Sequence, residues 1–517
     1  MKPFLAILSA CILSATALVA SDVVTKTPQQ LDALYHGLDP SSISQHLAFY
    51  KLYPDTPQGR DAYDDAIHLL GGNSYDGSTT ITTPLPSNAI NTMVSLITVP
   101  GGTTTTTPFT DDECLAISNI ASRLKNRHLP GYNAATEEEV LSLDDTDIDI
   151  ARALLLSYYG DDDVEEISRY EALLDIMSLE ILAGLSDEAP PEDIIRAISR
   201  FVFETMRFRF PPESLYRQDI DYYTFLPSVL DSRRGVCLGV STLYLCIAQR
   251  LGLDLEVVTP PGHIFLRYRH DDGTFTNIET TARGIDIPTE SYLGINTRSL
   301  QERSYKEVIG LAHYNQASVW WQGGDYDKAL ASYQKAVPYL PNDTIAQEFL
   351  AYAFIATGDK NKGKKILKAV HDVTPDDLVC RDTIADEYLD GNVDIDGIAM
   401  LFTHTDETRV SIFEKQEKLH DILELYPKFR AGHLALSITW LQLSREKEAL
   451  QSLQKYHALD SGDPTVEYYL STIYFSRQDY KNAYIHLSNV LALTASRDHK
   501  PKALEIMKRT LEVRSSE

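Results

Sequence analysis

The stretch GDYDKALASYQKAVPYLP at residues 324–341 is followed, 34 residues later, by GDKNKGKKILKAVHDVTP at residues 358–375. The same period returns further along the chain, where Ala449 precedes Ala483 by 34 residues. A period of this length is typical of a helix–turn–helix unit that stacks on further copies of itself. Each of the two quoted stretches begins with glycine and ends with proline, residues that favour turns and helix ends. The sequence therefore predicts an all-α solenoid for the C-terminal part of the chain.

Small side chains at the crossing point let two antiparallel helices approach closely. Ala317, Ala329 and Ala336 supply them in the first copy, and Gly363 takes the corresponding position in the second. These copies resemble the tetratricopeptide repeat (TPR) family. The resemblance implies a repeat region at 305–510 whose groove binds a protein or peptide partner.

The repeats do not keep one phase along the whole region. We expect two repeats at about 310–377, a phase break at 378–428, and two more repeats ending at about residue 495. Trp320, Trp321 and Tyr326 in the first repeat offer aromatic surface for a ligand. Aromatic residues at such positions usually pack between helices, and packing is the preferred interpretation.

The chain opens with MKPFLAILSACILSATALVAS at residues 1–21. One lysine, an apolar run and small residues near Ala20 predict a signal peptide, and therefore export to the periplasm or secretion. Leu8 to Cys11 also resembles a lipoprotein cleavage box, but the apolar run continues past Cys11, so a lipid anchor there ranks second. Residues 22–110 are expected to form polar helices followed, from residue 73, by a Thr/Pro/Gly-rich linker or loop.

The chain has 517 residues and a net charge of −27. Such a charge repels nucleic acid, so nucleic-acid binding is not expected. After the leader no stretch reaches ~18 uninterrupted apolar residues, so an integral membrane protein is not expected either. The cysteines beyond the leader form no CxxC pair and no His/Cys cluster, which predicts neither a metal site nor a cofactor. They are Cys114, Cys237, Cys246 and Cys380.

Residues that can carry chemistry gather between 232 and 284, where a helical pattern gives way to the strand-like runs LEVV, HIFLRYR and TFTNIE. The apolar spacing after Cys237 predicts a helix that starts there and ends at Gly252. The positive end of the helix dipole favours a thiolate at its N-terminus. Cys246 lies mid-helix among apolar residues and is interpreted as a core thiol.

His263 is expected at the start of a strand, with Glu279 on the strand that returns after the turn HDDG. A three-residue loop with Gly273 in the left-handed conformation would place residue 263 opposite residue 281 and Glu279 diagonally on the same face. A two-residue loop would place Glu279 on the other face. Asn277 is a second candidate to orient the imidazole, and Glu279 is preferred.

A cysteine, a histidine and an acid in this order follow the arrangement of a papain-like triad. The pieces RRGVCLGVSTLYLCIAQRLGL, PPGHIFLRY and TNIETT resemble the transglutaminase-like superfamily, and in particular a bacterial branch with a helical N-terminal region and C-terminal TPR repeats. The resemblance implies Cys237 as nucleophile, His263 as base and Glu279 as orienting acid. Glu279 departs from the family pattern, which usually has aspartate there.

The expected protein is thus multidomain. A helical lead-in and an α+β transglutaminase-like domain at 111–300 precede the TPR solenoid. By resemblance it is an exported thiol protein that transfers an acyl group or hydrolyses an amide or peptide bond, with the repeats binding protein. The alternative is a non-catalytic TPR scaffold with a degenerate transglutaminase-like domain.

Overall fold

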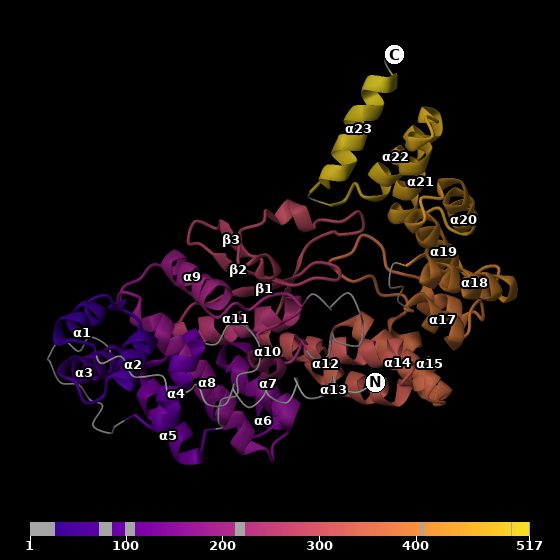
Figure 1. Cartoon of the computed structure of the whole chain (residues 1–517). Helices are drawn as coiled ribbons and strands as arrows, with labels where there is room; N and C mark the ends of the chain where they lie inside the picture. The colour runs from indigo at the N-terminus through magenta and orange to yellow at the C-terminus, as the bar shows by residue number, and fades with distance from the viewer. Residues whose placement is uncertain are drawn as a thin grey trace, which may run out of the picture. The chain divides into compact units, whose positions relative to one another are not determined.

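A computed structural model of the chain is shown in Figure 1. It describes residues 26–71, 85–98, 109–211, 223–403, 405, 408–497 and 499–515. The leader at 1–21, with Cys11, lies outside these residues. Among the helices of the described ranges, none is both long and apolar enough to cross a membrane. The chain divides into two compact units, Met1–Pro84 and Leu85–Glu517.

The first unit holds three short helices, α1 (Pro28–Tyr35), α2 (Ile43–Leu52) and α3 (Pro57–Gly71). Thr27 caps α1 with its side chain, which accepts a hydrogen bond from the backbone of Gln30. One buried residue from each helix forms the small core: Leu31, Phe49 and Ala62. The described part of this unit is therefore a helical cluster with its own core.

The second unit begins with a helix inside the region expected to be a linker or loop. Residues Ser87–Thr98 form helix α4, so the loop interpretation is wrong for this part. Ala89 and Met93, one helical turn apart, are buried, and the side-chain amide of Asn88 donates to Glu113 of the following helix over 3.1 Å. Burial of this apolar face stabilises the helix, although turn-forming residues surround it in the sequence. The flanking residues 72–84 and 99–108 lie outside the described ranges.

A helical layer follows, as the apolar periodicity predicts. Its longer helices bury one face each around the central helix α11, whose residues are almost all buried. The α-helices are α5 (Asp111–Ile120), α6 (Glu137–Ser142), α7 (Ile150–Tyr159), α8 (Val164–Ala183), α9 (Pro191–Ser199), α10 (Leu226–Ser232) and α11 (Cys237–Leu251). A π-helical turn, Arg200–Thr205, extends α9.

Four short strands form one antiparallel sheet in the order β3-β2-β1-β4. The strands are β1 (Glu256–Thr259), β2 (Phe265–Arg269), β3 (Phe275–Ile278) and β4 (Gln301–Arg303). The first three were expected. β4 was not, because three polar residues carry no strand pattern. It lies beside β1, with Thr259 opposite Gln301.

The hairpin between β2 and β3 has the three-residue loop. The backbone N–H of His270 donates to the carbonyl of Thr274 over 2.9 Å, and Gly273 between them has φ +82°. Arg267 pairs with Asn277 and Leu266 with Ile278, which is the register of a three-residue loop. The three-residue alternative is therefore confirmed and the two-residue loop is excluded.

The C-terminal region consists of antiparallel helix pairs, as expected from the 34-residue period. Two pairs precede the phase break: α12 (Tyr305–Gln322) with α13 (Tyr326–Ala336), and α14 (Thr344–Ala356) with α15 (Lys360–Val370). Two pairs follow it: α19 (Arg430–Gln442) with α20 (Glu446–Leu459), and α21 (Pro464–Ser476) with α22 (Tyr480–Leu493). Helix α23 (Lys502–Ser515) packs on α22.

The small residues expected at the helix crossings are buried. Ala317, Ala329 and Ala336 have no exposed surface. Trp321 is also buried and packs edge-on against the ring of Tyr326. The aromatic residues of the first repeat therefore pack between helices, in agreement with the preferred interpretation.

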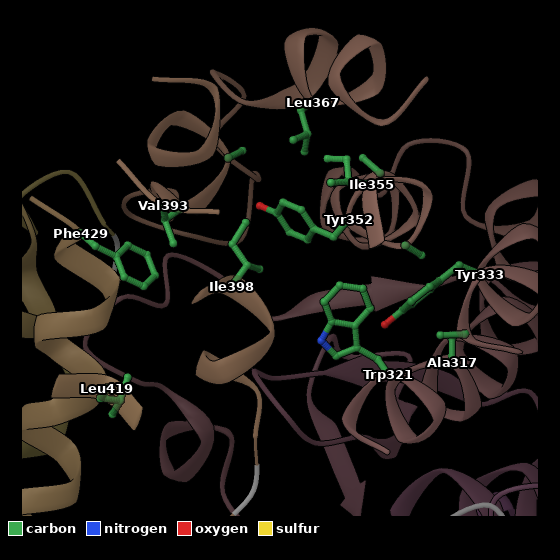
Figure 2. Packing of buried hydrophobic residues seen from close by; sticks show 14 of the residues in the cluster. Ala317, Trp321, Tyr333, Tyr352, Ile355, Leu367, Val393, Ile398, Leu419 and Phe429 are labelled. Carbon is green, nitrogen blue, oxygen red and sulfur yellow. The ribbon is translucent and has the colours of Figure 1, made fainter. Parts of the chain in front are cut away.

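The phase break does not interrupt the core. It contains the short helices α16 (Ile384–Leu389) and α17 (Ile395–Leu401) and the longer α18 (Arg409–Leu425). One cluster of buried side chains runs from Trp321 and Tyr352 through Val393 and Ile398 to Phe429. Figure 2 shows these side chains gathered from both sides of the break. The break is thus a change of helix length inside a continuous hydrophobic core.

Candidate active site

Cys237 is the first residue of α11, as expected. Its position is fixed by close packing around the first turn of the helix. A Cβ atom on Gly239 would lie 2.2 Å from the carbonyl oxygen of Tyr223, so only glycine fits there. The N-cap residue, Val236, makes no side-chain hydrogen bond to this helix end. The thiol therefore lies at the N-terminal turn of the helix, at the positive end of the dipole.

His263 follows a tight turn that starts at Pro260. The backbone N–H of His263 donates to the carbonyl of Pro260 over 3.0 Å, and Gly262 has φ +72°. Pro261 followed by a left-handed glycine is typical of a type II turn. The strand β2 begins two residues after His263. The turn places the imidazole beside Cys237, in the same cleft and near enough for the thiol to act on the pKa of the ring.

Glu279 lies just beyond the end of β3 and contacts the far side of the same ring. Its Oε2 atom is 2.7 Å from His263 Nε2. The hydroxyl of Tyr292 donates to the same oxygen over 2.7 Å, and the backbone N–H of Thr281 donates to Oε1 over 3.0 Å. Because the strand has ended, the longer arm of glutamate reaches the imidazole without displacing it. Nε2 faces Glu279, which leaves Nδ1 for the thiol.

The electrostatics of the three side chains favour charge separation. Hydrogen bonds to Cys237 and Glu279 raise the pKa of His263 to about 10, although burial acts in the opposite direction. Burial also raises the pKa of Glu279, but hydrogen bonds from His263, Thr281 and Tyr292 outweigh it and bring that pKa to about 2. At neutral pH the pair is an imidazolium and a carboxylate. An imidazolium beside a thiol stabilises the thiolate.

Asn277 does not take part in this arrangement. Its amide nitrogen donates to the carbonyl of Ile287 over 2.7 Å and to Thr289 over 3.2 Å. Among the described residues, Glu279 is the one that contacts the far nitrogen of His263. Cys246 is fully buried in α11, and burial raises the pKa of its thiol. It is therefore a core thiol.

Sequence reasoning missed Tyr292. This residue ends a 3₁₀ turn, Thr289–Tyr292, in a segment without periodic pattern. Its hydroxyl binds Glu279, and its ring stacks at 5.9 Å on His263 and at 4.3 Å on Phe265. A tyrosine in an irregular segment gives no sequence signal for such a role. It holds both the acid and the imidazole in place.

Sequence reasoning also missed the second wall of the site. A cleft of about 400 Å³ contains Cys237 and His263 on one side. The other side comes from the first two TPR pairs, with apolar residues and two carboxylates. These repeat residues are Leu311, Tyr314, Leu340, Ile345, Asp343 and Asp377. The cleft thus joins the Cys-His site to the repeats.

Arg303 on β4 fastens the two walls together. Its guanidinium contacts Asp343 over 2.9 Å and Glu307 over 3.2 Å, and its Nε donates to Thr259 over 3.1 Å. A second link joins Asn296, in the loop before β4, to residue 380 of the phase break through hydrogen bonds of 2.8 and 2.9 Å. The cleft is therefore held by charged and backbone contacts from both sides.

Comparisons with known proteins agree with these features in part. Residues 168–302 match the model of the transglutaminase-like superfamily (Transglut_core2). A search of curated proteins gave no match. Among solved structures, MamA residues 41 to the end from Desulfovibrio magneticus RS-1 is 16% identical with a TM-score of 0.19, over 37% of this chain and 97% of MamA.

A thermophilic TPR protein from Thermus thermophilus (TTC0263) is 18% identical, with a TM-score of 0.21, over 40% of this chain and 99% of its own. Likenesses of this size add nothing to the helix pairs described above. The superfamily match, by contrast, spans Cys237, His263 and Glu279. Residues 168–302 of this chain therefore form a domain of the transglutaminase-like superfamily.

Proposed function

We propose that this protein is a thiol enzyme that acts on an amide or peptide bond through Cys237. The observation that carries the proposal is the position of His263, beside Cys237 in one cleft and hydrogen-bonded to Glu279 over 2.7 Å. Nucleophile, base and orienting acid stand in the order that covalent acyl transfer needs. The site opens into a cleft large enough for an extended side chain.

In this proposal the Cys237 thiolate attacks the acyl carbon and forms a new C–S bond. The imidazolium of His263 gives its proton to the leaving nitrogen as the C–N bond breaks. Water or a second amine then attacks the thioester, His263 takes up the proton of that nucleophile, and the thiolate leaves. Water yields an acid and an amine yields a new amide. Glu279 keeps the imidazole oriented throughout and stabilises its charged form before and after the thioester stage.

The TPR wall of the cleft is proposed to present the substrate. A protein or peptide partner held by the repeats would place its side chain between Ile345 and Cys237. The leader pattern at residues 1–21 supports the further proposal that the protein is exported to the periplasm or secreted.

Alkylation of the full chain tests the activated thiol. At pH 6, iodoacetamide should modify Cys237 and leave the fully buried Cys246 unmodified, as measured by peptide mass spectrometry. His263→Ala should abolish the reactivity of Cys237 at pH 6. If Cys237 reacts only near the free-thiol pKa of ~8.5, the proposal fails.

A substrate assay distinguishes an enzyme from a non-catalytic scaffold protein. The full chain is incubated with a glutamine-rich protein and a fluorescent primary amine, and both incorporated label and released ammonia are measured. Turnover that is lost in Cys237→Ala and His263→Ala, with folding intact by circular dichroism, supports the enzyme. Unchanged partner binding and unchanged biological function in both variants would instead establish the non-catalytic scaffold.

A further inference from the structure

Three polar side chains meet between consecutive repeat helices, far along the chain from Cys237. His457 lies in the last turn of α20, Glu467 in the first turn of α21, and His486 on α22. One ligand-type atom from each lies within 4.8 Å of the other two. We call these residues the His–Glu–His cluster. No sequence pattern indicates it, because its members are ten and 19 residues apart on three helices.

The carboxylate at the centre of the cluster is fully buried. The side chain of Glu467 has no exposed surface. Its Oε2 atom is 2.8 Å from His486 Nδ1 and accepts a hydrogen bond of 2.8 Å from the amide of Asn489. Burial raises the pKa of Glu467, but these hydrogen bonds outweigh it and hold that pKa below its usual value. The helices therefore hold a buried anion in a fixed orientation.

The other oxygen of Glu467 has no hydrogen-bond partner among the described residues. Its Oε1 atom and His457 Nδ1 are 2.6 Å apart, yet the pair lacks the alignment of a hydrogen bond. His457 Nδ1 has no other partner within the described ranges either. An unsatisfied buried carboxylate oxygen costs free energy, so such a group is expected to face a ligand.

The surroundings match those of a metal centre with one open side. The ring of Tyr474 stacks in parallel on His486 at 5.4 Å and fixes the plane of that imidazole. Asn489 orients the carboxylate in the way that outer-shell partners do in metal sites. The side chain of His457 is 32% exposed, against 13% for His486, so an ion and a water molecule can enter past His457.

We propose that the His–Glu–His cluster binds a divalent first-row transition metal ion, with Zn²⁺ as its best fit. Two imidazole nitrogens and one carboxylate oxygen form a ligand set typical of zinc with an open fourth position. An ion bound at about 2.0–2.1 Å to each atom separates the ligand atoms by about 3.3 Å. On binding, side-chain rotations of His457 and His486 would widen their 2.6 and 2.8 Å contacts with Glu467 to that spacing. The proposal is independent of the chemistry at Cys237.

Metal titration of the full chain tests the site. The protein is stripped with EDTA, and Zn²⁺ is added against a chromophoric chelator while bound metal is counted by elemental analysis. One ion per chain is expected, with an increase in melting temperature on binding. Affinity should fall as the pH falls below neutral, because the imidazole nitrogens must lose their protons to bind the ion. Co²⁺ in place of Zn²⁺ should give visible absorption from a site with imidazole ligands.

Matched variants assign the site. His486→Ala and Glu467→Gln should each lose the bound ion and the Co²⁺ absorption. The exposed His420, on α18, offers a control: His420→Ala should keep both. Cys237→Ala should keep both as well, which separates this site from the Cys-His pair. If the wild-type chain binds no ion, or if His486→Ala and Glu467→Gln, folded by circular dichroism, still bind it, the proposal is overturned.

Discussion

At the scale of single residues, Glu279 influences which side chains of the candidate site are charged. Its carboxylate accepts hydrogen bonds from His263, Thr281 and Tyr292. The pKa of Glu279 is brought to about 2 and that of His263 to about 10, so both stay charged from mildly acidic to mildly basic pH. A glutamate in place of the usual aspartate thus still makes the contact that the triad needs. The charge on the imidazole depends on this contact.

Glu279→Gln should therefore lower the reactivity of Cys237 at acidic pH. The amide keeps the shape of the side chain but removes its negative charge, so the pKa of His263 should fall. A loss of stability of the thiolate–imidazolium pair equivalent to one pKa unit lowers the thiolate fraction at acidic pH about tenfold. The rate of alkylation at pH 6 should fall by about tenfold, and by less at pH 8.5, where any thiol ionises. Both rates are measured by mass spectrometry of the Cys237 peptide in samples quenched at successive times.

Tyr292→Phe is the matched comparison, because it removes one hydrogen bond to Glu279 and leaves the carboxylate charge. Its alkylation rate at pH 6 should lie between those of the wild type and Glu279→Gln. Equal rates for all three proteins would show that Glu279 does not control the imidazole.

At the scale of elements, α11 carries Cys237, the proposed nucleophile, at one end and a buried ion pair near the other. Arg250, fully buried near the C-terminus of the helix, contacts Asp175 of α8 over 2.9 Å, and Arg127 contacts the other oxygen of that carboxylate. Close packing fixes the start of the helix at Gly239. The position of Cys237 therefore depends on contacts along the whole length of α11.

Asp175→Ala should destabilise this domain strongly. The substitution leaves two guanidinium groups without their carboxylate, one of them fully buried, and removal of one partner of a buried pair costs about 3–5 kcal/mol. Asp193→Ala removes an exposed ion pair with Arg196 and should cost about 0–1 kcal/mol. Urea unfolding followed by circular dichroism gives both losses. A similar small loss in the two variants would contradict the structural role of Asp175.

The elements also show what the sequence could predict. The helix start at Cys237 and its end at Gly252 follow from apolar spacing and a glycine with φ +78°. For the hairpin, the sequence left two registers open. The structure has Gly273 in the left-handed conformation and therefore the register of the three-residue loop. Helix α4 was missed because turn-forming residues around it concealed its apolar face. Tyr292 and β4 were missed because their positions depend on tertiary contacts, which leave no periodic pattern in so short a stretch.

At the scale of the second unit, the repeats and the transglutaminase-like domain share one cleft. The 34-residue period predicted the helix pairs, but nothing in it indicated that Leu311 and Ile345 would face Cys237. Arg303 and the Asn296 contacts that hold the walls together join residues 40 to 84 positions apart. Such long-range pairs cannot be read from one sequence. The repeats therefore form part of the candidate site in addition to their proposed role in binding a partner.

This shared cleft predicts that a repeat residue controls access to Cys237. Ile345 on α14 is 38% exposed and lines the cleft, so Ile345→Trp should narrow it without entering the core. A bulky maleimide dye should then modify Cys237 roughly tenfold more slowly, the effect expected of a pocket contact. Iodoacetamide is small and should keep its rate.

Val373 is the matched control, because it is a similarly exposed apolar residue of the repeats that does not line the cleft. Val373→Trp should change neither rate. The ratio of the two rates, measured on the same Cys237 peptide, cancels any effect of the substitution on the thiol itself. A bulky-reagent rate that is unaffected by Ile345→Trp would mean that substrates reach Cys237 by another route, and that the TPR wall does not take part in selecting them.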